Sequence, residues 1–362
     1  MGDERVLPVL IGPFSGPIHG VSVINNALHA LMVQRGLRPA ILDLSPGPRA
    51  RGLAYHAVRT ARTAWGIFRI LGAPLSRTRR RYVMHLDGGS GLVYNIALAL
   101  ALRVTGQAVL FYHHSSRYVL ADSALMRTLL RFAGPAPQLF CSGKMAALFF
   151  ERYRPRGPAL IINNAAWVNP VPETGRQQGN GALRLGFLSV LTLDKGVGRA
   201  LETLRALHRR GVPAELALAG PVRDPAARRL IDQAQIEFGS ALHVRGLVRG
   251  PDRDGFLAGL DYFLFPSLYP HETQSLVVPE ALSAGVPVIA YDHRFVGEVV
   301  GKAGLLIPPL EDFAARGVDW IASGDGLLAE RRKQAKAHFE SMRKDASGQI
   351  DDLLAWTGGG QL

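Results

Sequence analysis

Short apolar runs alternate with longer helical patterns along almost the whole chain of 362 residues, and this alternation limits the possible folds more than any other feature. The runs are apolar at consecutive positions, which predicts strands that are buried on both faces. Strands of this kind, separated by helices, form parallel sheets that helices cover on both sides. The sequence therefore predicts an α/β fold, with strands at Val6–Ile11, Ala40–Leu44, Tyr82–Leu86, Ala108–Tyr112, Gln138–Cys141, Leu160–Ile162, Leu183–Val190, Ala214–Ala219, Leu242–Arg245, Tyr262–Phe265 and Val286–Ala290.

One break divides this alternation into two halves of similar size. Asn169–Gly181 is rich in Pro, Gly, Asn and Gln and has no apolar period, which indicates a linker. Two alternating halves predict two Rossmann-like domains whose parallel sheets face each other across a cleft. We expect an N-terminal acceptor-side domain at residues 1–168, a linker at 169–181 and a C-terminal domain at 182–340. A C-terminal helix and tail at 341–362 should pack back toward the N-terminal domain, and the glycines near 358 predict a frayed end.

The chain is strongly basic, with a formal net charge of +13, and 36 of its 42 basic residues are arginine. Such an excess of arginine favours anionic partners such as phosphates or an anionic membrane surface. The single cysteine, Cys141, excludes an internal disulfide framework and a cysteine-based zinc site. The apolar stretches are far shorter than the ~20 residues that a spanning helix needs, and we see no targeting segment. We expect a cytoplasmic protein with peripheral contact to the inner face of the cell membrane.

The most informative segment is Phe265–Ala290, in which a strand end, a loop, a helix and the next strand follow one another. The loop carries Glu272 and the helix carries Glu280, with seven residues between them. Helical geometry puts their backbones up to ~12 Å apart, roughly the span of a sugar, a diphosphate and a ribose. Each carboxylate can accept hydrogen bonds from a pair of sugar hydroxyls, and a helix N-terminus nearby offers N–H groups to phosphates. The segment therefore predicts a site for a sugar nucleotide; two solvated surface glutamates are the alternative.

The same segment resembles the signature of retaining glycosyltransferases of family 4 (glycosyl transferases group 1), which have the GT-B fold. The resemblance covers Glu-x7-Glu, the following Ala-Leu-Ser-Ala-Gly-Val-Pro-Val-Ile-Ala and the preceding Phe-Pro-Ser. It implies that Glu272 contacts and positions the donor sugar and that Glu280 holds the ribose. The family usually has Gly-Phe-Gly in the loop between them. Here the expected donor-binding loop is less permissive and comprises Thr273, Gln274, Ser275 and Leu276.

A second part of the resemblance concerns the loop after the strand Leu183–Val190. Lys195 precedes a helix there, and a lysine at a helix N-terminus opposes the macrodipole, so it fits a ligand for an anion. In the family, Arg-x4-Lys-Gly holds the donor diphosphate. Lys195 matches the lysine, whereas Val190 stands in place of the arginine, so the second charge is missing or comes from an arginine elsewhere. The resemblance also places three residues of other strand ends beside the nucleotide: Gly220, Gly246 and Leu247.

The first loop of the N-terminal half lies between the first strand and the first helix. Its glycines and prolines do not fit the dinucleotide fingerprint Gly-x-Gly-x-x-Gly. The loop is similar instead to the first loop of family 4 enzymes, which reaches the donor phosphates and the acceptor. The resemblance implies that Gly20 binds the donor, and we expect Gly16 and His19 on the acceptor side.

Two histidines, His113 and His114, follow an apolar strand at the same edge of the sheet. One of them resembles the family histidine that faces the donor sugar. We assign His114 to that role and His113 to the acceptor side, although core or turn histidines are the plain alternative. No carboxylate or cysteine spacing supports a metal site there.

An Asp-x-Asp motif, Asp252 to Asp254, looks like the metal motif of the other glycosyltransferase fold. It precedes an expected helix at Gly255–Leu260, and aspartate is a preferred helix cap. We therefore interpret the motif as a cap.

The segment between Asp43 and Asp87 has nine arginines and no acidic residue. Apolar residues interleave with the arginines, which predicts a basic amphipathic helix. Such a helix can lie on an anionic leaflet, where each charge contributes ~1 kcal/mol. Nucleic-acid binding is the competing interpretation, but no recognition pattern accompanies the charges, and a solvated helix is the plain alternative. We expect membrane contact through Arg59, Arg62, Trp65, Phe68 and Arg69.

These features predict an enzyme of the hexosyltransferase type that moves a sugar from a nucleoside-diphosphate sugar to a glycan or lipid-linked acceptor in cell-surface polysaccharide synthesis. The expected catalytic residues are Glu272, His114 and Lys195, and Lys195 stabilises the leaving diphosphate electrostatically. We expect no metal, no other cofactor and no nucleic-acid partner; the sequence does not indicate the oligomeric state. The alternatives are a GT-B-like sugar-nucleotide epimerase or phosphorylase, a nicotinamide-dependent oxidoreductase, and a non-enzymatic protein that binds nucleotide sugars.

Overall fold

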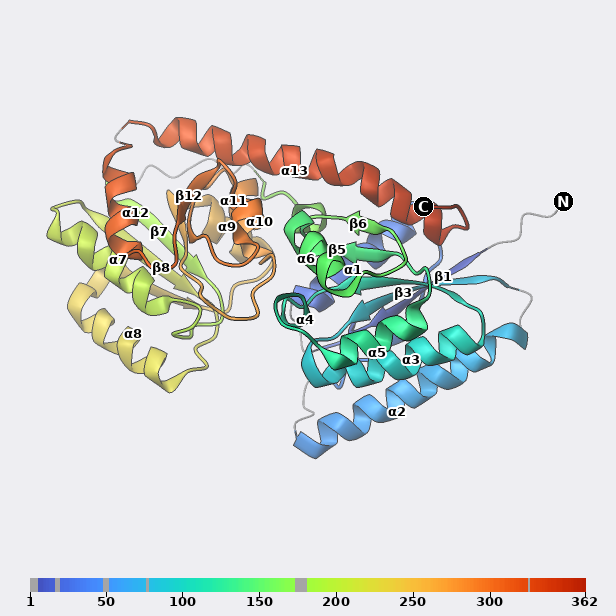
Figure 1. Cartoon of the computed structure of the whole chain (residues 1–362). Coiled ribbons are helices and arrows are strands. Elements are labelled where there is room, and N and C mark those ends of the chain that lie inside the picture. The colour runs from blue at the N-terminus through green and yellow to red at the C-terminus, as the bar shows by residue number, and fades with distance from the viewer. Residues whose placement is uncertain (1–5, 17–19, 48–51, 76–77, 173–180, 325) are drawn as a thin grey trace. The chain divides into compact units, whose positions relative to one another are not determined.

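The computed structural model describes residues 6–16, 20–47, 52–75, 78–172, 181–324 and 326–362. By its internal contacts the chain divides into two compact units. Unit 1 comprises Met1–Trp167 and Asp345–Leu362, and unit 2 comprises Val168–Lys344. Each unit contains one six-stranded sheet with helices on both of its faces (Figure 1).

The sheet of unit 1 has the strand order β2-β1-β3-β4-β5-β6, and its neighbouring strands are parallel. The order reverses between β1 and β3, and open parallel sheets bind ligands outside the carboxyl ends of the strands at such a switch point. The strands are β1 (Leu7–Gly12), β2 (Ala40–Asp43), β3 (Arg80–Leu86), β4 (Ala108–His113), β5 (Gln138–Phe140) and β6 (Ala159–Ile161). The helices are α1 (Gly20–Gln34), α2 (Gly52–Leu71), α3 (Leu92–Val104), α4 (Arg117–Leu120), α5 (Ala124–Ala133) and α6 (Gly143–Tyr153), with 3-10 turns η1 (Ala73–Leu75), η2 (Gly89–Gly91) and η3 (Asn164–Trp167).

The sheet of unit 2 has the order β12-β11-β10-β7-β8-β9 and is also parallel. Its order reverses between β10 and β7, so the loops after these two strands meet at the switch point. The strands are β7 (Leu183–Leu188), β8 (Ala214–Ala219), β9 (Leu242–Gly246), β10 (Tyr262–Phe265), β11 (Val288–Tyr291) and β12 (Gly304–Ile307). The helices are α7 (Val197–Arg209), α8 (Pro225–Phe238), α9 (Pro251–Ala258), α10 (Val277–Ser283), α11 (Val296–Val300), α12 (Phe313–Ala322) and α13 (Leu328–Thr357), with η4 at Gly239–Ala241.

The predicted α/β class and parallel sheets are confirmed, and each of the eleven predicted strands overlaps an observed one. The sequence analysis missed β12, which is only four residues long and pairs with β11 alone at the edge of its sheet. Three of its four residues are only half-buried, so it lacks the continuous apolar run of the interior strands.

Apolar residues at helical spacing hold each layer to its sheet. In unit 2, Leu201 and Leu204 on one face of α7 pack with Phe187 of β7 and Ile231 of α8 in a single buried cluster. Burying a side chain of this size stabilises the fold by ~1.5–3 kcal/mol. Because packing of this kind fixes the helices on the sheet, the loops at the strand ends can carry binding residues.

The C-terminal helix α13 begins in unit 2, and its residues from Asp345 onward belong to unit 1. The tail after it is held in place rather than frayed, which corrects the expectation from its glycines. The Arg81 guanidinium donates hydrogen bonds to the main-chain carbonyls of Trp356, Gly359 and Gly360. A cation at this position also complements the negative end of the helix dipole.

The basic helix predicted in the arginine-rich segment exists as α2, but its orientation differs from the prediction. Arg59 is only 4% exposed and pairs with Asp87, so it cannot contact a membrane. Arg62 is directed to Asp43, with 3.0 Å between Nη1 and Oδ2. Trp65 and Phe68 do lie on the surface, 57% and 66% exposed, with their rings stacked 5.5 Å apart.

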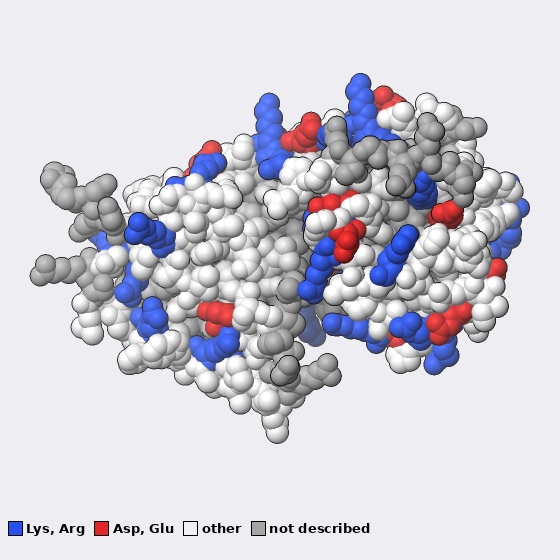
Figure 2. Space-filling model, turned by 180° about the vertical axis from the view of Figure 1, so that it is seen from behind, with Lys and Arg blue, Asp and Glu red and all other residues white. Residues whose placement is uncertain are grey.

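Lys and Arg side chains are scattered over the face shown in Figure 2, where they outnumber Asp and Glu. Among the described residues, no helix is long and apolar enough to cross a membrane.

Candidate active site

The loop after β7 reaches the switch point of the unit 2 sheet and carries Lys195. Gly196 has φ +93°, and a β carbon there would lie 2.3 Å from the carbonyl oxygen of Pro266 at the end of β10. Only glycine allows both the left-handed backbone and this close approach. The glycine therefore lets the loop of Lys195 pack closely against the end of β10. This places the Lys195 side chain beside the loop that carries Glu272.

Lys195 and Glu272 form an ion pair, with 2.7 Å between Nζ and Oε2. The Ser267 hydroxyl donates to the same carboxylate oxygen over 3.0 Å. The ammonium also lies 4.3 Å from the centre of the Tyr269 ring, a cation–π contact. Glu272 is only 7% exposed, so its charge depends on these partners. Two residues with separately predicted roles thus lie in direct contact.

Glu280 is equally buried, on the first turn of α10, and Arg253 of α9 donates to its Oε1 over 2.7 Å. Burial raises the pKa of Glu280 to about 7, and the Arg253 guanidinium only partly opposes that rise. Arg253 also pairs with Asp254. The sequence analysis left open whether an arginine elsewhere supplies the diphosphate charge that is missing at Val190. Arg253 does not answer that question, because its ion-pair partners are Glu280 and Asp254.

The raised pKa of Glu280 makes stability depend on pH. Between about pH 4.5 and pH 7 the folded protein binds more protons than the unfolded chain, so the free energy of unfolding falls as pH rises through this window. A shift of this size corresponds to at most about 3 kcal/mol. We expect the wild type to lose stability relative to Glu280→Gln when urea titrations at about pH 5 and about pH 8 are compared. Parallel pH profiles of the two proteins would contradict this.

The remaining predicted donor-binding residues lie around the same edge. Gln274 is buried, whereas Thr273, Ser275 and Leu276 are half-buried in the loop before α10. Gly220 follows β8 with φ +126°, and a β carbon there would lie 1.7 Å from the Ser189 carbonyl oxygen. The other two are Gly246 at the end of β9, with φ +64°, and Leu247, which is 59% exposed.

Two residues after β11 were missed by the sequence analysis. Burial and the neighbouring Arg294 charge lower the pKa of His293, and the Glu272 charge opposes that shift in part. Arg294 has φ +60°, which is rare for a residue other than glycine, and its Nε is buried without a hydrogen-bond partner. A basic His-Arg pair that begins two positions after the end of a buried strand was the signal that could have pointed to them.

Unit 1 has a cavity of about 250 Å³ at the carboxyl edge of its own sheet, near the β1/β3 switch point. His114 lines it together with His85, which was not predicted. His85 Nδ1 lies 2.9 Å from His114 Nε2, and His85 Nε2 is buried without a partner. Burial lowers the pKa of His85 to about 3, so the ring is neutral at physiological pH. The Arg59–Asp87 ion pair lines the same cavity.

The assignment of His113 to the acceptor side is wrong. The side chain is fully buried, with Nδ1 3.1 Å from the Tyr118 hydroxyl and Nε2 2.8 Å from Gln138 Oε1. Its ring also stacks on Phe140, 4.3 Å away. Successive residues of a strand point to opposite faces, which separates His113 in the core from His114 at the cavity.

The first loop of unit 1 is tied down by Asp43. Burial by itself raises the pKa of this carboxyl. The hydrogen bonds from Ser15, Ser45 and main-chain N–H groups together outweigh burial and lower the pKa to about 2. Gly16 is half-buried in this loop, and Gly20 is exposed as the first residue of α1. His19 lies outside the described residues.

The interpretation of Asp252 and Asp254 as helix caps is wrong in detail. Both lie inside the first turn of α9, and Gly250 is the residue that precedes the helix. Acidic residues there still complement the helix dipole. Within the described part of the chain, no group of three or more His, Cys, Asp or Glu side chains is placed to hold a metal ion.

Comparison with known proteins supports the assignment of this chain as a glycosyltransferase. Residues 182–323 match the family described as Glycosyl transferases group 1. The fold of the chain is that of solved GT-B glycosyltransferases, and the family match together with these structures supports a transferase. No curated protein is similar enough in sequence to count as a relative.

Three solved structures illustrate the likeness. A glycosyltransferase from Rickettsia africae is 12% identical, with a TM-score of 0.68 over 96% of this chain and 98% of that chain. HepE from Anabaena, solved in complex with UDP, is 14% identical, with a TM-score of 0.66 over 96% of this chain and 99% of that one. WaaG, a glycosyltransferase involved in lipopolysaccharide biosynthesis, is 14% identical, with a TM-score of 0.63 over 98% and 100%. At these identities the likeness shows the fold alone.

Proposed function

We propose that this protein is a retaining glycosyltransferase of family 4 that transfers a sugar from a nucleoside-diphosphate sugar to a glycan or lipid-linked acceptor. The observation that carries the proposal is the 2.7 Å pair between Lys195 and Glu272 at the β7/β10 switch point, with buried Glu280 eight positions along the chain. One cation and two carboxylates suit a ligand with a diphosphate between two groups of hydroxyls.

In the proposed reaction Lys195 binds the diphosphate and stabilises the negative charge that develops as it leaves. Main-chain N–H groups of the loop before α10 add to this stabilisation, which is electrostatic. Glu272 positions the donor sugar and Glu280 the ribose. The proposed chemistry calls on no metal, because the protein itself supplies the positive charge.

The donor and acceptor classes draw support from the similar structures. HepE is solved with UDP and with UDP-glucose, which makes a uridine nucleotide the first donor to test. WaaG is involved in lipopolysaccharide biosynthesis, in line with a cell-surface glycan as the acceptor. The cavity beside His114 is a candidate for part of the acceptor site. Exposed Trp65, Phe68 and Arg69 on α2 support peripheral contact with the cytoplasmic face of the membrane.

A thermal-shift panel of UDP, GDP, ADP and their glucose conjugates tests the donor site. We expect one base to raise Tm selectively, because a ligand at about 100 times its Kd stabilises the folded state by about 2.7 kcal/mol. The matching nucleosides, which lack the diphosphate, are the control and should have little effect. No shift with any nucleotide at millimolar concentration would overturn the proposal. Once a sugar donor is found, NMR of the anomeric proton in the product tests retention.

A further inference from the structure

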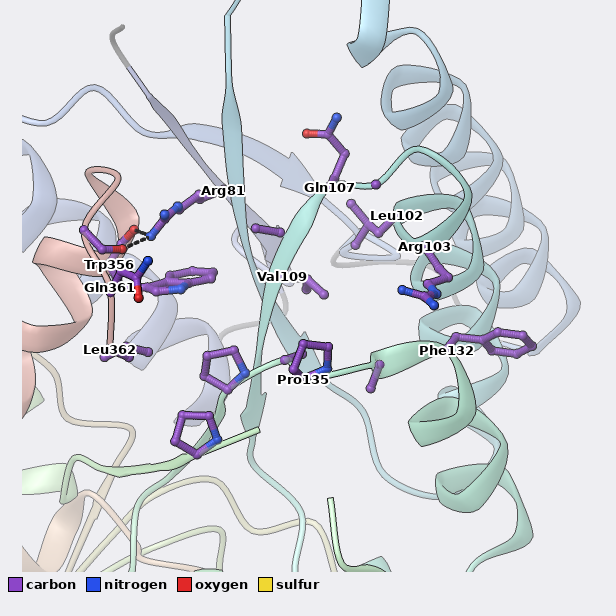
Figure 3. Close-up of a pocket in the computed structure, with 17 residues that line it drawn as sticks. Arg81, Leu102, Arg103, Gln107, Val109, Phe132, Pro135, Trp356, Gln361 and Leu362 are labelled. Carbon is purple, nitrogen blue, oxygen red and sulfur yellow. Dashed lines mark hydrogen bonds between the residues drawn. The ribbon is translucent and has the colours of Figure 1, made fainter. Parts of the chain in front are cut away.

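Three cavities border the amino edge of the unit 1 sheet, at the opposite end of the strands from the His114 cavity. The central one has a volume of about 400 Å³ and lies between the start of β3 and β4, the ends of α3 and α5, and the C-terminal tail (Figure 3). Much of its lining is apolar, with Leu102, Val109, Phe132, Pro135 and Trp356. None of the predicted site residues lines it, so the proposed transfer chemistry does not account for it.

Two arginines line the central cavity, Arg81 of β3 and Arg103 at the end of α3; in Figure 3 the Arg81 side chain is turned toward the C-terminal tail. Arg81 bonds only to main-chain carbonyls of the tail, which carry no net charge. Within the described part of the chain no carboxylate pairs with Arg81 or Arg103. Burial and the nearby Arg79 charge lower the pKa of Arg81, the direction expected where positive charge lacks an anion.

Basic side chains also line the two flanking cavities. One, of about 470 Å³, shares Arg81 with the central cavity and adds Arg79 and Arg80. The other, of about 440 Å³, is lined by Arg127, Arg131, Arg154 and Arg156. Gly134, which also lines it, lies next to the Arg103 guanidinium, so the cavities adjoin. No Asp or Glu is among the described residues that line the three cavities.

Exposed apolar side chains accompany these arginines. Leu75 is 92% exposed, and its neighbours Ala73 and Pro74 line one flanking cavity. Val104, directly after Arg103, is 71% exposed. Large apolar residues next to arginines suit a bilayer surface, where the side chains enter the acyl boundary and the guanidinium groups meet phosphates. The rings of Phe132 and Trp356 line the cavity, but the exposed positions Leu75 and Val104 carry no ring on which a nucleic-acid base could stack.

We propose that the amino edge of the unit 1 sheet docks on a bilayer and binds the phosphate groups of anionic phospholipids. Arg81, Arg103, Arg131, Arg154 and Arg156 bind the headgroups, while Leu75 and Val104 enter the apolar boundary. Arg127 of the same flanking cavity is held by Asp122, with 2.7 Å between Nη2 and Oδ1, and is not part of this set. The inference rests on the membrane contact included in the proposed function, and it adds this edge of the sheet to the exposed Trp65, Phe68 and Arg69 of α2 as the surface that meets the bilayer. It does not depend on the transfer chemistry.

Co-sedimentation with vesicles tests the proposal, using phosphatidylcholine alone and phosphatidylcholine mixed with phosphatidylglycerol. We expect binding to the anionic vesicles only, and binding that weakens as salt is added. Arg103→Gln and Arg131→Gln should each lower partitioning about fivefold. Leu75→Asp should lower it about tenfold.

Two matched variants serve as controls. Leu53→Asp changes a leucine that is 90% exposed at the other end of α2, and Arg228→Gln changes an exposed arginine of unit 2. Both should bind vesicles like the wild type. Equal binding to the two kinds of vesicle, wild-type binding by Leu75→Asp and Arg103→Gln, or displacement of the vesicles by a short RNA would each overturn the proposal. The nucleotide-induced Tm shift, measured on the same preparations, reports separately on the donor site.

Discussion

Replacement of Lys195 by alanine is expected to lower kcat by about 10²–10³-fold, the usual cost of removing one preorganised group that stabilises developing negative charge. Lys195 is the cation that the fold aims at the β7/β10 switch point, held there by Glu272 and by the Tyr269 ring. Its charge acts mainly on the leaving diphosphate, so kcat should fall more than KM rises. Initial rates with the donor identified by the nucleotide panel provide the measurement.

The alanine variant also leaves Glu272 buried without its cation, which by itself costs stability. Lys195→Arg keeps the charge and is the matched control, expected to fold normally and to recover part of the activity. Glu272→Gln alone and together with Lys195→Ala complete a double-mutant cycle that separates the ion pair from the chemistry. Unchanged kcat in a folded Lys195→Ala protein would show that the diphosphate binds elsewhere.

Replacement of Glu280 by alanine is expected to weaken nucleotide binding by about 10²–10⁴-fold, because the two ribose hydroxyls lose the hydrogen bonds that they donate to the carboxylate, and each such bond to a charged group contributes about 1.5–3 kcal/mol. Isothermal titration with the preferred nucleotide measures the loss. Glu237→Ala is the matched control, since it also removes a carboxylate from an arginine pair, with Arg205, but this pair lies on the surface of α7 and α8. It should bind nucleotide like the wild type. Equal weakening in both variants would assign the effect to general destabilisation.

Local patterns were enough to predict both sheets and the two glutamates. A strand end, its loop and the next helix are continuous in sequence, so Glu272 and Glu280 could be placed on them without knowledge of the rest of the fold. The same holds for Lys195, because a strand, a tight glycine loop and a helix lie within one short segment. Their predicted roles stay predictions until the nucleotide is tested.

Residues that reach a site from another segment could not be predicted in this way. Arg253 is 27 positions from Glu280, and only the packing of α9 beside α10 brings its guanidinium to that carboxylate. His85 belongs to β3 and meets His114 because β3 and β4 are neighbours in the sheet. Strand order is a property of the whole sheet, and no local pattern encodes it.

The arginine-rich helix α2 separates what the sequence determines from what the tertiary structure determines. Its alternating apolar and basic residues determined that α2 is a helix, since that pattern depends only on the spacing along one segment. Which arginines face water was decided by tertiary structure. The charge of Arg59 alone favours the surface, but its ion pair with Asp87 and its contact with the Tyr94 ring stabilise it in the interior. Buried charges depend on partners that the chain supplies from a distance, whereas secondary structure depends on neighbours in sequence. For that reason the sequence by itself determined the elements and the fold class, and only the tertiary structure decided which charged side chains form sites.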